Sequence, residues 1–281
     1  MNNPLLTNLN ECLNQLVMYK GTLHYIETEL NKNRTRVLDS YTDEQISSLF
    51  SGHRLAITDL SEFPDDGWRK YYAAPGLFVI SGEDYLNYVD AVLERESSWT
   101  IFQGYEIFEL FLKNTIAIFL LNNKNSIDPD KMQRFISKKG DGYEPKNIDD
   151  YKEFLNYSYR DKNNRKLIKL ISSISSEFSI ILTDNNRSIE IVEWYEMLSE
   201  VRHAITHMNF TLKSTTVSNY SEIQKTYLYE FFPVEKTKNG FRLRLNRKHA
   251  ERIISMLAEY AFTIFKCLSK VGNYEMGIFS E

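Results

Sequence analysis

Residues 199–210 read SEVRHAITHMNF and carry four side chains with useful chemistry: Glu200, Arg202, His203 and His207. Histidine titrates near neutral pH and can act as base or acid on a ribose 2′-hydroxyl. Arginine stays charged and can hold a phosphate that gathers negative charge in a transition state. The Arg-x4-His pair of Arg202 and His207 therefore has the chemistry for RNA cleavage by 2′-hydroxyl attack, a reaction that needs no metal ion.

The pattern around these residues predicts a helix over 188–210, with Ser188 as its N-cap. One side of that helix is expected to face the core through Ile191, Trp194, Leu198, Val201, Ile205 and Met208. The opposite side carries Glu196, Glu200, His203 and His207. Arg202 and His207 diverge by roughly 140° on one helix. A single helix therefore brings the pair together poorly, and a second copy of the helix would solve this.

Other interpretations of the stretch stay open. Glutamates and histidines four apart are common on a solvated helix face, and a bare Arg-x4-His pattern occurs by chance. The spacings Glu200-x-x-His203 and His203-x3-His207 also suit metal ligands, although a di-iron bundle needs a second Glu-x-x-His, which the chain lacks. Two copies that pack this polar face would bury charges that must be paired.

The composition favours a mainly helical globular protein. The 281 residues are 42% apolar and 26% charged, which suits one large domain or two ordinary ones, and the scarcity of glycine and proline favours helices. The net charge of -4 excludes a broadly cationic binder of nucleic acid or membrane. Two cysteines, Cys12 and Cys267, provide no disulfide framework. We see no secretory signal and no membrane span, and expect a soluble cytoplasmic protein.

Apolar periodicity predicts the elements. Helices are expected at 5–31 (broken near Gly21), 43–50, 84–96, 98–122, 129–138, 149–157, 163–174, 188–210 and 247–270. Residues 61–78 are expected to form an ordered loop. We divide the chain into a mostly helical region of unknown role, 1–95, and a helical bundle, 96–281, that carries a polar insertion at 124–187.

The segment 227–245 changes from a helical to an alternating period behind an Asn-Gly pair, which predicts a β-hairpin. Asn246 is expected to cap the last helix, which Gly272 ends. We expect four basic residues here either to hold an RNA backbone or to be solvated: Arg242, Arg244, Arg247 and Lys248. The locally basic stretch 159–169 is interpreted as a solvated insertion rather than an RNA-contacting surface.

The segment WYEMLSEVRHAITHMN, at 194–209, resembles the signature helix of the HEPN superfamily. Members of this superfamily are helical bundles marked by Arg, four to six residues and then His, usually with a polar residue directly after the Arg. Arg202 matches the family Arg, His203 the polar follower and His207 the family His, and Glu200 also fits the pattern.

An upstream segment extends the resemblance, which covers roughly residues 98–270. QGYEIFELFLKNTI, at 103–116, resembles an earlier core helix of the family, with polar residues in familiar positions: Tyr105, Glu106 and Glu109. This sequence departs from the family at two positions. His203 stands where many members carry Asn. Asn209 stands where a toxin subgroup carries a Tyr that is modified, which puts that form of control in doubt.

The resemblance implies an activity and a partner. Many members are metal-independent endoribonucleases in which the Arg-x4–6-His helices of two protomers form one composite site. Homodimerisation through helix 188–210 would then join Arg202 of one protomer to His207 of the other. Members often serve as toxins or as effectors of antiviral defence, and some bind nucleotides. RNA and a regulatory protein are the expected partners, with no cofactor and no metal.

The predicted fold is mainly α: an antiparallel bundle of HEPN type with a small β-hairpin before the last helix. The first functional hypothesis is an endoribonuclease in which Arg202 holds the phosphate and His207 transfers the proton, supported by His203 and Glu200. The second is a non-catalytic HEPN-like module that binds a nucleotide or a protein. The third is a metal-dependent helical enzyme that uses Glu200, His203 and His207.

Overall fold

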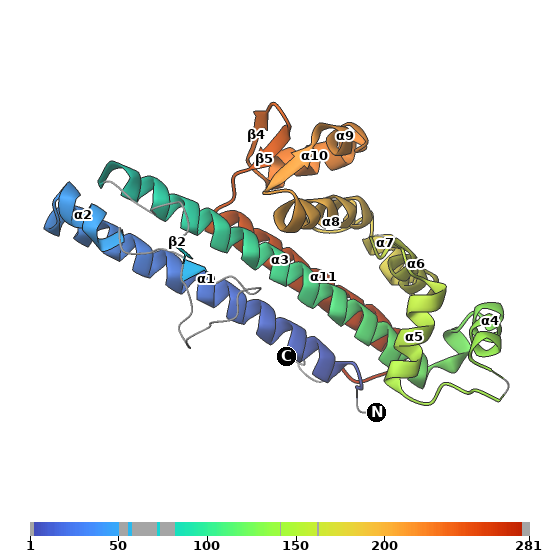
Figure 1. Cartoon of the computed structure of the whole chain (residues 1–281). Coiled ribbons are helices and arrows are strands. Elements are labelled where there is room, and N and C mark those ends of the chain that lie inside the picture. The colour runs from blue at the N-terminus through green and yellow to red at the C-terminus, as the bar shows by residue number, and fades with distance from the viewer. Residues whose placement is uncertain are drawn as a thin grey trace, which may run out of the picture. The chain divides into compact units, whose positions relative to one another are not determined.

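Figure 1 shows a computed structural model of the whole chain. The chain divides into two units. The structure describes residues 3–50, 56–57, 72–73, 82–140, 142–161 and 163–276. Unit 1 comprises Met1–Leu23 and Glu96–Glu281, and unit 2 comprises His24–Arg95. The region 1–95 is thus shared between the units. The loop predicted at 61–78 lies outside the described residues, apart from Tyr72 and Ala73.

The protein is mainly α, as its composition predicts. The helices are α1 (Leu6–Ser40), α2 (Asp43–Phe50), α3 (Gly82–Asn122), the short 3-10 turn η1 (Lys124–Ser126), α4 (Pro129–Lys139), α5 (Ile148–Ser158), α6 (Arg165–Ile174), α7 (Ser176–Ile181), α8 (Ile191–His207), α9 (Ser214–Ser218), α10 (Glu222–Phe231) and α11 (Arg247–Val271). The strands are β1 (Ala56–Ile57), β2 (Tyr72–Ala73), β3 (Thr211–Lys213), β4 (Val234–Thr237) and β5 (Gly240–Leu243). Within the described ranges, none of these helices offers an apolar stretch that could span a bilayer.

Two long helices are more continuous than predicted. The expected break near Gly21 is wrong, because α1 passes through this glycine, which is exposed and has open space around it. The helices predicted at 84–96 and 98–122 form the single helix α3. Ser97 and Ser98 lie where the two predicted helices meet, and both are fully buried inside α3 rather than capping a helix end.

Helix α8 is shorter than the predicted 188–210. Ser188 is not its N-cap, because Ser188 has a left-handed backbone with φ 53°, whereas an N-cap is extended. Glu190 occupies that position, with φ −81° and ψ 101°. At the other end, Asn209 and Phe210 are also left-handed, and the Phe210 amide donates to the Ala204 carbonyl at 3.0 Å. This bond satisfies a helix-end carbonyl and turns the chain immediately after His207.

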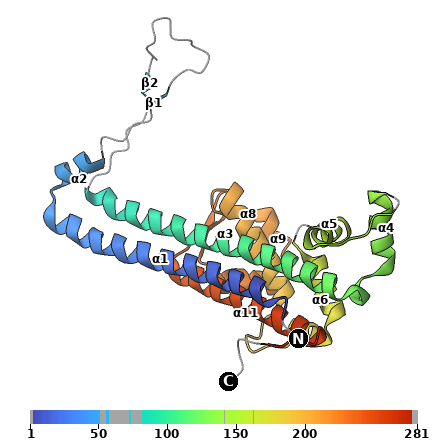
Figure 2. The same ribbon diagram turned by 90° about the horizontal axis from the view of Figure 1, so that it is seen from below.

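In unit 1, α3 lies at the centre of the helices and its neighbours run in both directions (Figure 2). Contacts between α3 and α11 advance together along both helices, from Gly104 against Ile254 to Phe108 against Tyr260, so these two helices are parallel. Helix α8 runs the other way, since Tyr195 stacks on Tyr105 while Arg202 reaches back to Phe102. The prediction of an antiparallel bundle is therefore wrong for the pair α3 and α11.

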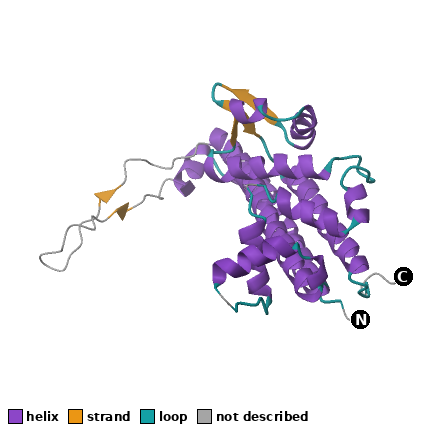
Figure 3. Ribbon diagram, turned by 90° about the vertical axis from the view of Figure 1, so that its right-hand side faces the viewer, coloured by secondary structure: helices purple, strands orange, loops and turns teal. Residues whose placement is uncertain are grey.

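The β-hairpin prediction is confirmed, with two corrections. The hairpin occupies Val234–Thr237 and Gly240–Leu243, while the first part of the predicted range 227–245 belongs to helix α10. A third strand, β3, pairs with β5, which gives the antiparallel order β3-β5-β4 at the edge of the helices (Figure 3). Asn246 caps α11 as predicted, through a capping box with His249.

Polar side chains tie the first residues of the chain into unit 1. Asn3 donates to the Ser269 hydroxyl at 2.9 Å and to the Glu275 carbonyl at 3.0 Å. Asn8 donates to the Thr115 hydroxyl at 2.6 Å, which joins α1 to α3. These asparagines are buried, so their hydrogen bonds offset the cost of desolvating the amides.

Unit 2 has a small core of its own. Its buried apolar residues are Ile46, Tyr85 and Val89, with partly buried neighbours on α1 and α3. Arg34 and Asp90 form an ion pair at 3.0 Å across these helices. No residue with a proposed chemical role lies in the described part of unit 2.

Candidate functional site

The apolar side of α8 anchors the helix as predicted. The buried residues on this side are Ile191, Trp194, Leu198, Val201 and Ile205. Met208 was expected on the same side, but it lies just beyond the helix end and is only partly buried. Truncation of a buried tryptophan such as Trp194 typically costs about 3–5 kcal/mol, so this face fixes the rotation of α8 firmly. That rotation decides where Arg202 and the two histidines point.

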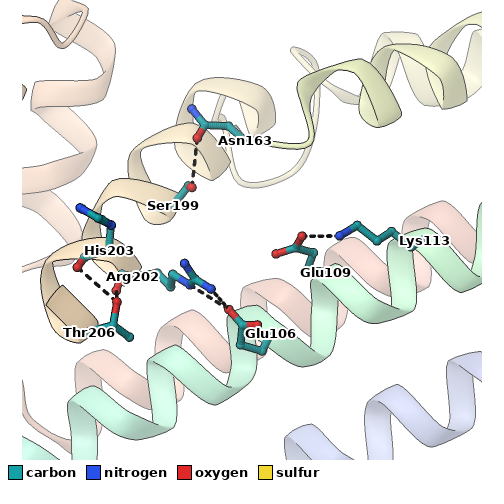
Figure 4. Close-up of polar contacts among 8 residues, drawn as sticks. All are labelled: Glu106, Glu109, Lys113, Asn163, Ser199, Arg202, His203 and Thr206. Atoms are coloured by element: carbon teal, nitrogen blue, oxygen red, sulfur yellow. Dashed lines mark hydrogen bonds and ion pairs between the residues drawn. The ribbon is translucent and has the colours of Figure 1, made fainter. Parts of the chain in front are cut away.

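Arg202 points at α3, where it is held by Glu106 (Figure 4). Its Nε donates to Glu106 Oε1 at 2.8 Å, and its Nη2 donates to the same oxygen. The guanidinium carbon also lies 5.5 Å from the Phe102 ring centre and 5.8 Å from that of Tyr105, within the range of cation–π attraction. A carboxylate and two aromatic rings therefore position this cation, and 30% of its side chain stays exposed.

The Tyr105 ring beside Arg202 packs against a second tyrosine. Tyr105 and Tyr195 stack with ring centres 5.2 Å apart and planes 11° apart. Burial raises the pKa of the Tyr105 hydroxyl and raises that of Tyr195 well above its usual range. Tyr195 thus packs against the Tyr105 ring that lies beside the Arg202 guanidinium.

His203 and His207 face solvent on the neighbouring side of α8. Both are exposed, and their ring centres lie 5.0 Å apart. Arg202 and His207 are both in the described part of the chain, and no hydrogen bond joins them within the protomer. Both residues belong to the regular helix α8 and are five positions apart, so roughly 140° of helix rotation separates them.

A small pocket of about 140 Å³ adjoins the histidine side of α8. It brings Glu200 and His203 together with Lys213 of β3 and Thr216 of α9. Among the described residues, no group of three or more His, Cys, Asp or Glu side chains is arranged to hold a metal ion, and this includes Glu200, His203 and His207.

A larger polar pocket of about 510 Å³ lies farther along α3. Glu109 and Lys113 form an ion pair at 2.6 Å on its α3 side. Asp161 and Asn164, from the connection between α5 and α6, also line it. The same connection reaches α8, because the Ser199 hydroxyl donates to Asn163 at 3.1 Å (Figure 4). Glu109 therefore belongs to a different polar environment from Glu106, one helical turn away.

The basic residues near the hairpin are mostly engaged inside the protomer. Arg244 pairs with Glu235 at 2.8 Å, and Arg247 pairs with Glu251 at 2.8 Å. Arg242 is partly buried on β5, whereas Lys248 is exposed at the start of α11. None of these four residues is among the described side-chain contacts of Arg202, which are with Glu106, Phe102 and Tyr105.

Sequence reasoning did not identify two contributors to the site. Phe102 lies beside the Arg202 guanidinium, and Asn163 binds Ser199 one turn before Arg202. The apolar pattern of α3 could indicate that Phe102 is near the core, but no local signal links Phe102 to Arg202, 100 positions later, or Asn163 to Ser199, 36 positions later.

Comparison with known proteins adds no assignment: no family model, curated protein or solved structure matches this chain.

Proposed function

We propose that the protein is a metal-independent endoribonuclease of HEPN type whose site is shared by two protomers. The observation that carries the proposal is the geometry of α8. Arg202 is fixed by Glu106 and two rings, while His207 is exposed and lies five residues later, roughly 140° around the same helix. A two-fold axis beside α8 would let His207 of one protomer approach Arg202 of the other.

The chemistry follows from the residue types. Arg202 would hold the scissile phosphate and offset the charge that develops on it. His207 would take the proton of the ribose 2′-hydroxyl or deliver one to the leaving oxygen. Glu106 fixes the guanidinium in one orientation, and His203 and Glu200 would contribute to the environment of the proton transfer. The resemblance places such an activity among toxins and effectors of antiviral defence.

RNA cleavage in EDTA tests this proposal. The wild type and the variants Arg202→Ala and His207→Ala are incubated with a broad mixture of RNA sequences. We expect each substitution to lower the cleavage rate by about 100-fold or more, as removal of one transition-state partner does. Matched controls are Arg187→Ala, another ion-paired surface arginine, and His24→Ala, another exposed histidine. No cleavage by the wild type, or equal cleavage by all variants, would overturn the proposal.

A second candidate function is a non-catalytic module that binds a nucleotide or a protein. It is favoured by the pairing of Arg202 with Glu106, which already offsets the charge of that arginine within one protomer. This candidate predicts RNA or nucleotide bound to the purified protein with no turnover. The cleavage experiment therefore separates the two functions.

A further inference from the structure

A second basic region lies in the insertion, away from α8. Between η1, α4, the end of α5 and α6 there is a pocket of about 650 Å³. Figures 1 and 2 show α4, α5 and α6 gathered near the end of α3 that is followed by η1. The basic side chains of this pocket are Lys131, Lys166 and Lys169, and we call it the lysine pocket.

The lining of the lysine pocket suits an anion. Its three ammonium groups face only one carboxylate in the lining, that of Asp128, which is 3.8 Å from Lys131. Hydroxyl groups from Ser126 and Ser158 supply further hydrogen-bond donors, whereas the Ser173 hydroxyl donates to the Leu170 carbonyl at 2.7 Å. The pocket therefore carries an excess of two positive charges, although the whole chain has a net charge of -4.

The lysines differ in how they are held. The Lys131 ammonium lies 4.0 Å from the ring centre of Tyr159, which fixes its position through cation–π attraction. Lys166 and Lys169 are exposed and lie three residues apart on one face of α6. Within the described ranges, neither of these two forms an ion pair with a carboxylate. The Lys166 ammonium only donates to the Arg160 carbonyl at 3.3 Å.

We propose that the lysine pocket binds the phosphate groups of nucleotides, supplied either by an RNA strand or by a free nucleotide. The volume of about 650 Å³ lies within the range of small-molecule sites. Lysine serves as a point charge for phosphate, and the hydroxyls of Ser126 and Ser158 would add hydrogen bonds by donation. The site is separate from Arg202 and does not depend on cleavage, so it goes beyond the proposed ribonuclease activity.

Binding of a fluorescein-labelled 2′-O-methyl RNA hexamer tests the proposal by fluorescence anisotropy. This probe lacks the free 2′-hydroxyl that the proposed cleavage requires, so the result does not depend on ribonuclease activity. The variant Lys166→Gln/Lys169→Gln is compared with Lys152→Gln/Lys225→Gln, which makes the same change in net charge at lysines that already pair with carboxylates outside the pocket. A Lys166→Arg/Lys169→Arg variant retains the charge. Binding of ADP, measured by calorimetry, forms the second arm.

We expect the pocket variant to bind the hexamer at least about tenfold more weakly at low salt. The slope of log association constant against log salt concentration should become shallower by about 1.4, because two lysines no longer contact phosphates. The paired-lysine control and the arginine variant should bind like the wild type. If only ADP binding falls, the phosphate source is a free nucleotide; if hexamer binding falls, it is an RNA strand. Equal affinities in the pocket variant and its control, or no wild-type binding of either probe, would overturn the proposal.

Discussion

Two groups of basic side chains in unit 1 differ in what surrounds them. Arg202 on α8 and Arg244 on the hairpin each have a carboxylate partner within the protomer. Lys166 and Lys169 in the lysine pocket are exposed and form no such pair in the described part of the chain. The two groups therefore have different physical properties, even though a count of positive charges treats them alike.

The two groups are suited to different tasks: a paired arginine can orient a phosphate, and an unpaired lysine can attract one. A guanidinium held by a carboxylate has a fixed plane and can meet one phosphate oxygen in one geometry. An unpaired ammonium on a flexible stem attracts any phosphate nearby but specifies little geometry. We therefore expect substitutions at Arg202 to alter cleavage more than binding, and substitutions at the lysines to alter binding more than cleavage.

The largest expected effect comes from mixing two inactive variants. If each site takes Arg202 from one protomer and His207 from the other, a mixed dimer of Arg202→Ala and His207→Ala contains one intact site. When the two variants are mixed in equal amounts and exchange subunits, about half of the dimers are mixed and each has one intact site of two. The mixture should therefore recover about a quarter of the wild-type cleavage rate. A mixture of Arg202→Ala with the double variant is the control and should stay inactive. No recovery in the first mixture would show that each protomer works alone.

Stability of the hairpin gives the next largest effect. Gly240 has φ 145°, and a Cβ there would overlap the Leu212 carbonyl of β3. We expect Gly240→Ala to lower the free energy of unfolding by about 1–3 kcal/mol, measured in urea. Gly21→Ala is the matched control, since Gly21 lies in helix α1 with nothing near it; that change should raise stability by roughly 0.5–1 kcal/mol. An unchanged midpoint for Gly240→Ala would contradict the observed strand pairing.

Removing the partner of Arg202 should produce a moderate change in binding. In Glu106→Gln the Arg202 guanidinium loses its carboxylate partner. A phosphate group then no longer has to compete with that carboxylate for the guanidinium. We expect affinity for the uncleavable hexamer to rise by about three- to tenfold at low salt. Glu235→Gln, which removes the partner of Arg244, makes the same change in net charge and should have less effect. Equal gains in both variants would indicate that net charge alone controls binding.

The smallest effect concerns an ion pair between α7 and α11. Lys270 lies 2.8 Å from both oxygens of Glu177, and its hydrogen bonds are the main cause of the lowered pKa of this carboxyl. A lowered folded-state pKa adds stability above the ordinary pKa, and that stability is lost as pH falls through the folded value. The pair is partly exposed, so Glu177→Gln should cost only about a few tenths of a kcal/mol at pH 7.

Urea unfolding at several pH values checks this. The difference between wild type and Glu177→Gln should shrink as the pH falls from about 5 to about 3. The control Glu11→Gln changes an exposed carboxylate on α1 and should leave the curve unchanged. A difference that grew on acidification would contradict the assigned direction.

Local signals predicted the fold best where a cap or turn residue determines the backbone. Helix α2 was predicted at the observed residues, and α11 was predicted to within one residue because Asn246 caps it. The Asn-Gly pair located the hairpin. Strand β3 was missed because three residues have no detectable period and are specified by pairing with β5. The prediction of Ser188 as an N-cap is wrong because residue type alone does not reveal a left-handed backbone.

The candidate site was predictable only in part. Helical geometry correctly indicated that Arg202 and His207 diverge, since both belong to one element. The pairing of Arg202 with Glu106 depends on how α8 packs against α3, which the sequence expresses only through the combined apolar faces. The contacts of the hairpin arginines likewise depend on register: Glu235 lies across from Arg242 and accepts a hydrogen bond from Arg244.

The hydrogen bonds of Asn3 to Ser269 and Glu275 hold the first and last described residues of the chain close together. Any polypeptide attached before residue 3 or after residue 276 leaves unit 1 from one place. Two fluorophores fused there would lie close together in the native state and separate on unfolding. The pair would therefore give an energy-transfer signal for the integrity of unit 1 while leaving α8 and the lysine pocket unlabelled.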